Sequence, residues 1–208
     1  MISIKETNTI KAVKKTFISL YEENMNPSDP ELLKEDTLSL ELLPHDNEYR
    51  IYLKDNKLQI NPLYDNYFQN GFDLAKLECE YWTDELISSG KVKDIISYLR
   101  LNEYSKRAIL LTWKDEQKDL TKPAECMSYA FFRKSYNTLN INIHMRANNA
   151  FNYMLIDIDT MRIIQKYIAG QLNLEVGNYT HFIDSLHFYT KNKIDIDKLY
   201  FKWKNEEN

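Results

Sequence analysis

The stretch TLNINIHMR, residues 138–146, is the feature of this sequence that most limits the possible folds. From Leu139 onward, leucine, isoleucine or methionine occupies every second position, and asparagine, histidine or arginine fills the positions between them. This period of two is typical of a β-strand with one apolar and one polar face. Because the apolar face must be buried, the fold needs a second layer packed against this strand.

Further strands and helices are predicted on both sides of this stretch. ECMSYAFFRKS, residues 125–135, has the composition of a strand, and the short YNT segment joins it to residues 138–146. Apolar residues recur at helical spacing in residues 90–107 and again in residues 160–174, where Asp159 is the expected N-cap. The stripe of the first helix comprises Val92, Ile95, Ile96 and Leu99. The strand-like runs RAILLTW and GNYTHFIDSLHFYTKN come after these two helices.

This order of elements predicts an α+β fold in which helices cover a mixed β-sheet. The length of 208 residues suits a single domain, residues 1–208, and no repeat or flexible linker divides it. A formal net charge of −4 argues against a nucleic acid polymer as partner, because such binding needs an excess of lysine and arginine. We find no signal peptide and no apolar run long enough to span a membrane, so we expect a cytoplasmic protein.

Cys126 is the first candidate for chemistry. The sequence holds two cysteines, Cys79 and Cys126, and neither has a second cysteine or a histidine at zinc spacing, so no metal site is predicted. A lone cysteine at the start of an apolar strand is often a small core residue. If strand pairing brings Arg146 close, the guanidinium favours the thiolate, which is the form that attacks carbon electrophiles.

Other polar residues lie at the edges of the predicted elements. Lys106 and Arg107 can grip a phosphate, although such a pair is also common on a solvated surface. His187 and Tyr189 alternate on one strand and can bind a sugar hydroxyl, or they can be ordinary aromatic strand residues. Glu41 lies within an apolar run, where burial would bring its carboxyl group into the range of an acid or base catalyst.

The order and spacing of these residues resemble those of the thymidylate synthase superfamily, which includes the pyrimidine nucleotide hydroxymethylases. Ser105-Lys106-Arg107 resembles the family's SRR, Cys126 matches its nucleophilic cysteine, and Arg146 of RANN matches the phosphate-binding arginine of its RSxD motif. The interval 146 − 126 = 20 is the family's own. LNLEVGNYTHFIDSLHFY is similar to the family's LEPGEFVHTLGDAHIY.

The resemblance implies a homodimer formed through the sheet that acts on a pyrimidine nucleoside monophosphate. Cys126 would add to carbon 6 of the base, and carbon 5 would then attack the methylene group of methylenetetrahydrofolate. Arg146 would hold the 5′-phosphate, and Lys106 and Arg107 would reach this phosphate from the partner subunit. His187 with Tyr189 would bind the sugar 3′-hydroxyl.

The resemblance extends more weakly upstream. LELLPHDNEYRIYLKDN is similar to the family's HELLWFL region, which implies that Glu41 is the catalytic glutamate. NGFDLAKLECEYW is similar to NGDLGPVYGKQW, which places Trp82 among the cofactor-binding residues. Asn149 stands where the family has an aspartate that binds the pterin ring, and it is a further candidate binding residue.

Asp157 bears on the choice of base. The resemblance implies that uracil-directed synthases carry asparagine here and cytosine-directed hydroxymethylases carry aspartate. A carboxylate can accept a hydrogen bond from the exocyclic amine of cytosine but repels the carbonyl oxygen of uracil. The same residue can instead help to cap the following helix.

Several positions depart from the family pattern, mostly on the side that would bind folate. They are Met127, Met145, Ala147, Asn149 and Tyr153, which replace histidine, glutamine, serine, aspartate and glycine. The sequence also stops soon after LHFYTKN, before the segment with which the family closes over the folate. The favoured interpretation is a divergent, phage-like hydroxymethylase acting on a cytidine nucleotide. The alternatives are a nucleotide-binding protein that has lost folate chemistry and a divergent synthase acting on dUMP.

Overall fold

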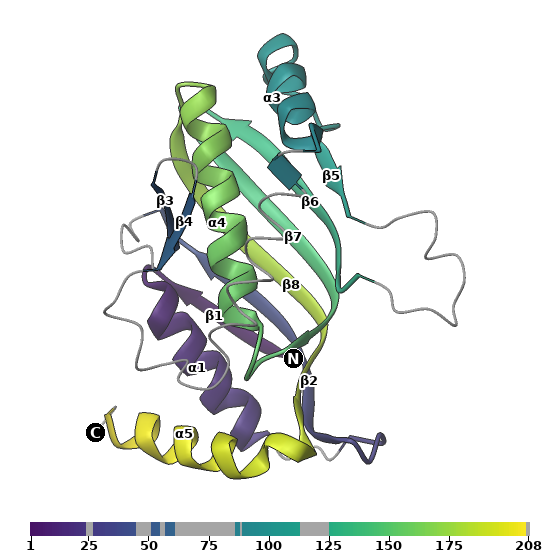
Figure 1. Ribbon diagram of the computed structural model, residues 1–208, viewed down its shortest axis with the longest axis vertical. Helices are drawn as coiled ribbons and strands as arrows, with labels where there is room; N and C mark the ends of the chain where they lie inside the picture. Colours follow the sequence, from purple (N-terminus) through teal and green to yellow (C-terminus); the bar gives the residue numbers. More distant parts are fainter. Residues whose placement is uncertain are drawn as a thin grey trace.

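The computed structural model describes residues 1–23, 27–44, 51–54, 57–60, 86–87, 89–112 and 125–206 (Figure 1). A six-stranded sheet has the order β1-β2-β8-β7-β6-β5. Its strands are β1 (Ile2–Glu6), β2 (Leu32–Leu42), β5 (Ile109–Leu111), β6 (Met127–Ser135), β7 (Thr138–Asn149) and β8 (Glu175–Tyr189). β3 (Ile51–Lys54) and β4 (Lys57–Ile60) form a separate pair. The helices are α1 (Thr9–Glu22), α3 (Lys91–Leu101), α4 (Met154–Gln171) and α5 (Lys193–Glu206), with a short 3-10 helix, η3 (Thr190–Asn192), before α5.

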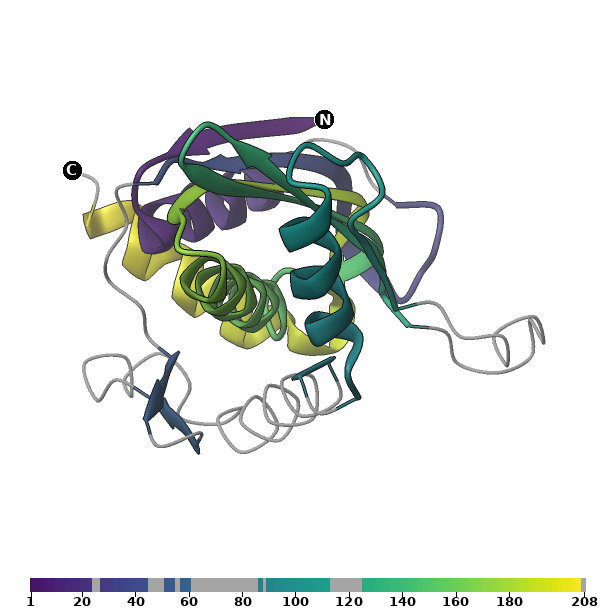
Figure 2. The same cartoon turned by 90° about the horizontal axis from the view of Figure 1, so that it is seen from above.

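The sheet is mixed, and the described helices lie on one side of it. β6 and β7 form an antiparallel hairpin, β7 and β8 run parallel, and β8 pairs antiparallel with β2. The parallel step from β7 to β8 is made through α4, which crosses the sheet. Viewed from above, α1, α4 and α5 lie below the curved sheet, and no described helix covers its other face (Figure 2). The predicted α+β fold is therefore confirmed.

The predicted alternation of apolar and polar residues in residues 138–146 is also confirmed. Leu139, Ile141, Ile143 and Met145 are buried, and Arg146 is exposed. The hairpin turn before them includes Tyr136 with a positive φ of 53°. The predicted stripe of α3, comprising Val92, Ile95, Ile96 and Leu99, is buried as well.

The predicted start of α4 is wrong. The helix begins at Met154 with Tyr153 as N-cap, so Asp159 lies inside the helix and is buried. Burial of Met154 and Ile158 explains the difference, because the apolar surface of the helix extends upstream of the expected cap. Asp157 consequently occupies the first turn of α4, where a carboxylate interacts favourably with the helix dipole. None of the described helices is both long and apolar enough to cross a bilayer.

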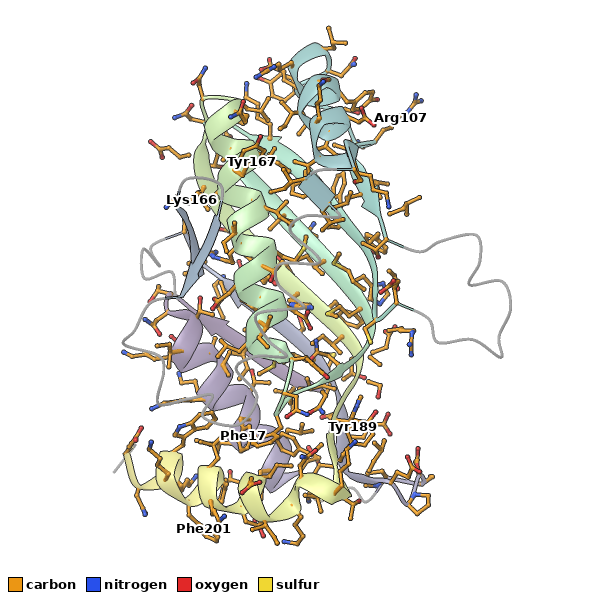
Figure 3. All side chains as sticks on the ribbon, viewed as in Figure 1. Phe17, Arg107, Lys166, Tyr167, Tyr189 and Phe201 are labelled. Atoms are coloured by element: carbon orange, nitrogen blue, oxygen red, sulfur yellow. The ribbon has the colours of Figure 1, made fainter. Side chains whose placement is uncertain are left out.

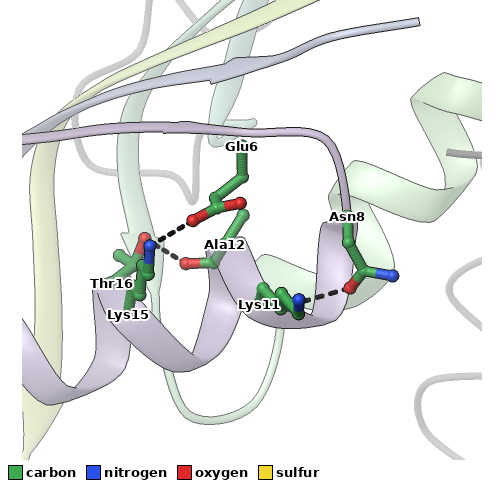
Figure 4. A network of polar contacts seen from close by, with 6 residues as sticks. All are labelled: Glu6, Asn8, Lys11, Ala12, Lys15 and Thr16. Atoms are coloured by element: carbon green, nitrogen blue, oxygen red, sulfur yellow. Dashed lines mark hydrogen bonds and ion pairs between the residues drawn. The ribbon is translucent and has the colours of Figure 1, made fainter. Parts of the chain in front are cut away.

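The N-terminal segment fixes α1 against the sheet (Figure 4). The Asn8 side chain accepts a hydrogen bond from the Lys11 backbone N–H at 3.0 Å and caps the helix. The ion pair between Lys15 and Glu6 ties α1 to β1.

An aromatic cluster secures the far end of β8. The Phe17 ring of α1 lies 4.6 Å from the Phe188 ring and 4.9 Å from the Trp203 ring of α5, measured between centroids. All three side chains are buried. The core thus anchors Phe188, whose neighbours in β8 are the two candidate residues His187 and Tyr189.

Candidate functional site

Strand pairing places Cys126 beside Arg146. The Arg146 backbone N–H donates to the Cys126 carbonyl oxygen at 2.9 Å, directly before β6 and near the end of β7. The Arg146 Nε–H donates to the Glu125 carbonyl oxygen at 3.1 Å, which fixes the guanidinium group at the base of the Cys126 segment. Both residues are exposed. Backbone pairing therefore brings Arg146 next to Cys126 in the sheet.

The parallel pairing of β7 and β8 adds His187 and Tyr189 to this end of the sheet. Asn149 pairs with His187, and the Ala150 backbone N–H donates to the His187 carbonyl oxygen at 3.0 Å. The His187 and Tyr189 rings are 4.8 Å apart in an edge-to-face arrangement.

The electrostatic surroundings of His187 connect it with Arg146. Burial lowers the pKa of His187 most, and the Arg146 charge lowers it further. The Ser185 carbonyl oxygen and the charges of Glu35 and Asp29 act in the opposite direction. The net lowering of the pKa favours a neutral imidazole. A neutral imidazole can accept a hydrogen bond from a hydroxyl group or donate one to it.

Glu35 lies next to the candidate residue His187, although its sequence context does not mark it as a candidate. It lies opposite His187 in the antiparallel pairing of β2 and β8, and the Ser185 hydroxyl donates to its carboxylate. The signal in the sequence is weak, because a glutamate that alternates along a strand is usually solvated. Its proximity to His187 follows only from the register of β2 on β8.

Asp157 lies at the start of α4 and accepts a hydrogen bond from a residue of the sheet. The Asn148 side-chain amide donates to its Oδ2 atom, and the Asp157 charge contributes to raising the pKa of buried Tyr179, after burial itself. Asn149 has a local role, because its amide oxygen accepts from the backbone N–H groups of Phe151 and Asn152 at 3.0 and 3.3 Å. That pair of bonds shapes the turn between β7 and α4.

Three other candidates are not brought to Cys126 within this chain. Glu41 pairs with Thr180 on β8, which pairs with Asn142 on β7, four positions before Arg146 and so about 13 Å along the strand. Its carboxylate contacts the Lys5 ammonium group at 2.8 Å and accepts from the Asn178 amide at 3.2 Å. The Glu41 carboxylate therefore makes its contacts away from the Cys126 thiol.

Lys106 and Arg107 are exposed between α3 and β5. Arg107 and Tyr189 lie at opposite ends of the molecule (Figure 3). β5, which follows both residues, pairs with Tyr129, Ala130 and Phe131 of β6, beyond the end of that strand next to Cys126. Trp82 lies outside the described residues.

Comparison with known sequences matches residues 42–205 to the family model described as Thymidylate synthase. The chain belongs to the thymidylate synthase family. Two similar relatives are the thymidylate synthases of Buchnera aphidicola subsp. Schizaphis graminum, 25% identical over 151 residues, and of B. aphidicola subsp. Acyrthosiphon pisum strain Tuc7, 24% identical over 151 residues. Each match covers 71% of this chain and 56% of the relative, so the chain spans about half the length of these thymidylate synthases.

Proposed function

We propose that this protein is a one-carbon transferase that modifies carbon 5 of a pyrimidine nucleoside monophosphate, with cytidylate as the favoured substrate and hydroxymethylation as the favoured reaction. The observation that carries the proposal is the pairing of Cys126 with Arg146, with neutral His187 close by. Membership of the thymidylate synthase family supports the general reaction class.

The proposed chemistry begins with the thiolate of Cys126. Its Sγ atom forms a bond to carbon 6, and the electron pair of the double bond between carbons 5 and 6 moves to carbon 5. Carbon 5 then takes an electrophile and later loses its original hydrogen as a proton. Expulsion of the thiolate restores the double bond. Arg146 would bind the 5′-phosphate by charge-assisted hydrogen bonds, and His187 and Tyr189 would bind the sugar.

Methylenetetrahydrofolate is the expected one-carbon donor in this family. The described residues fit it less well than they fit the nucleotide. The amide oxygen of Asn149 is engaged by two backbone N–H groups of the β7–α4 turn, and no carboxylate stands at that position. The proposed steps therefore assign no residue of this chain to the folate.

Asp157 supports cytosine over uracil as the base, because an ionised carboxylate accepts a hydrogen bond from an amine and repels a carbonyl oxygen. A synthase acting on dUMP remains the competing enzyme, since the family match fits it equally. The occupied Asn149 amide favours a second candidate of another class, a nucleotide-binding protein without folate chemistry.

Release of tritium from carbon 5 tests the proposal. Cytidine and uridine monophosphates, in ribo and deoxy forms, are tritiated at carbon 5 and incubated with the protein, with and without methylenetetrahydrofolate. We expect release that favours cytosine and is abolished by Cys126→Ser. Dependence on the folate would separate hydroxymethylation from simple exchange. Binding of a nucleotide without any release would reject the enzyme in favour of the binding protein.

A further inference from the structure

Asn148 is a buried polar residue that the proposed chemistry does not yet use. It lies in β7 opposite Leu186 of β8, and only 2% of its surface is exposed. Its amide nitrogen donates to Asp157 Oδ2 and lies 3.4 Å from the Met145 sulfur. Its amide oxygen has no hydrogen-bond partner among the described residues.

Packing alone does not explain an asparagine at this position. A buried amide oxygen without a partner is unfavourable by about 1–3 kcal/mol, and an apolar side chain of similar shape would remove that penalty. What an asparagine provides here is its side-chain N–H group, which donates a hydrogen bond to the Asp157 carboxylate. The observation therefore points to the contact with Asp157 as the role of Asn148.

The contact has two physical effects on Asp157. An N–H donor stabilises the ionised carboxylate over the protonated acid, as does the position of Asp157 in the first turn of α4. The donor comes from a buried strand, so it also fixes the rotation of the carboxylate relative to the sheet. A carboxylate has about four acceptor positions, and the bond from Asn148 occupies one of them.

We propose that Asn148 is a positioning residue that holds Asp157 ionised and oriented, and thereby sets the preference of the site for an exocyclic amine over a carbonyl oxygen. This inference rests on the proposed function, in which Asp157 contacts the base. Asn148 itself is not a catalytic residue, because it acts through Asp157.

Binding of dCMP and dUMP, measured by calorimetry, tests the proposal on three proteins. The unchanged protein should bind dCMP more tightly than dUMP. Asn148→Leu keeps the branched shape of the side chain but removes the donor, so we expect the ratio of the two affinities to fall about tenfold, mainly through weaker dCMP binding. Asn137→Asp, in the exposed β6–β7 turn, is the control and should leave the ratio unchanged.

Asn148→Asp adds a readout that a purely structural role would not give. At acid pH one carboxyl group of the pair is protonated and donates to the other, which restores the original contact. As the pH rises both groups ionise and repel, so the preference for dCMP should disappear with rising pH in this variant alone. Asp157 acts on the buried Tyr179 of β8 together with the charges of Arg162 and Asp159 of α4, so these are the ionisable groups that share its surroundings.

The outcomes separate this proposal from the proposed function. If Asn148→Leu weakened both nucleotides equally, or left the ratio unchanged in a folded protein, the positioning role would be rejected while nucleotide binding stood. If the unchanged protein bound neither nucleotide, both proposals would be rejected. Far-ultraviolet circular dichroism establishes that each variant is folded.

Discussion

Arg146 is central to the proposed site, because two hydrogen bonds join it to the Cys126 segment. Replacement by alanine removes a guanidinium group that would bind the 5′-phosphate. Charge-assisted hydrogen bonds contribute about 1.5–3 kcal/mol, so Arg146→Ala should weaken dCMP binding about 10- to 100-fold. Binding of deoxycytidine, which lacks the phosphate, should change little. Calorimetry with both compounds measures the difference.

Arg133→Ala is the matched control, since Arg133 is also exposed and lies on the same hairpin, opposite Asn140. It should leave both affinities unchanged. Equal losses for nucleotide and nucleoside in Arg146→Ala would contradict a phosphate contact.

At the scale of elements, the pairing of β7 with β8 carries the site, and Gly177 allows it. A Cβ atom at Gly177 would lie 2.1 Å from Asn140 Oδ1 and 2.9 Å from the Leu139 carbonyl oxygen. That amide oxygen accepts from the Asn178 backbone N–H at 2.8 Å. Gly177→Ala should therefore lower the free energy of unfolding by about 1–3 kcal/mol, as measured by urea denaturation.

Gly170 provides a control with the opposite sign. It lies near the end of α4, and nothing lies within 4 Å of a Cβ atom built there. Gly170→Ala should stabilise the protein by about 0.4–1 kcal/mol, because alanine loses less conformational entropy in a helix. A Gly177→Ala protein as stable as the original would show that β7 and β8 can move apart at this point.

Comparison of these elements with the predictions shows which parts of the fold follow from the sequence. The strand alternation of residues 138–146 and the apolar stripe of α3 predict those elements correctly, because each depends on neighbours close in the chain. The start of α4 was misplaced because a buried apolar turn precedes the expected cap. Glu35 could not be predicted, since its contact with His187 follows from the register of two strands about 150 residues apart.

At the scale of the whole molecule, the sheet face that no described helix covers is the proposed dimer surface. Exposed apolar side chains gather on β5 and β6, namely Ile109, Leu111 and Tyr129. Under the proposed function, in which a second subunit supplies Lys106 and Arg107, Leu111→Asp should convert a dimer to a monomer in sedimentation velocity and remove the tritium release. Ile194→Asp, at an exposed apolar residue of α5, should do neither. A monomeric original protein with full activity would contradict the shared site.

Acid stability is also a property of the whole fold. Burial, with a smaller effect of the His144 charge, lowers the pKa of His181 to about 3, whereas an unfolded histidine titrates near 6.5. Between these values the unfolded state binds more protons, so stability should fall as the pH drops from 6.5 towards 3, by up to about 4 kcal/mol.

His181→Asn removes this titration while keeping an acceptor for the Tyr179 hydroxyl, which lies 2.9 Å from His181 Nδ1. Urea denaturation across this pH range should therefore show a smaller slope for His181→Asn. The control His144→Asn changes a half-exposed histidine and should retain most of the slope, because His181 stays buried. An unchanged slope in His181→Asn would reject the assignment.

The central claim is that Cys126 and Arg146 belong to one nucleotide site, and protection of the thiol from alkylation tests it most directly. The rate of iodoacetamide labelling at Cys126 is measured by peptide mass spectrometry, which separates it from Cys79. Saturating dCMP should slow the labelling several-fold, deoxycytidine should slow it far less, and Arg146→Ala should abolish the protection. An unchanged rate at Cys126 with every cytidine and uridine monophosphate would contradict the account.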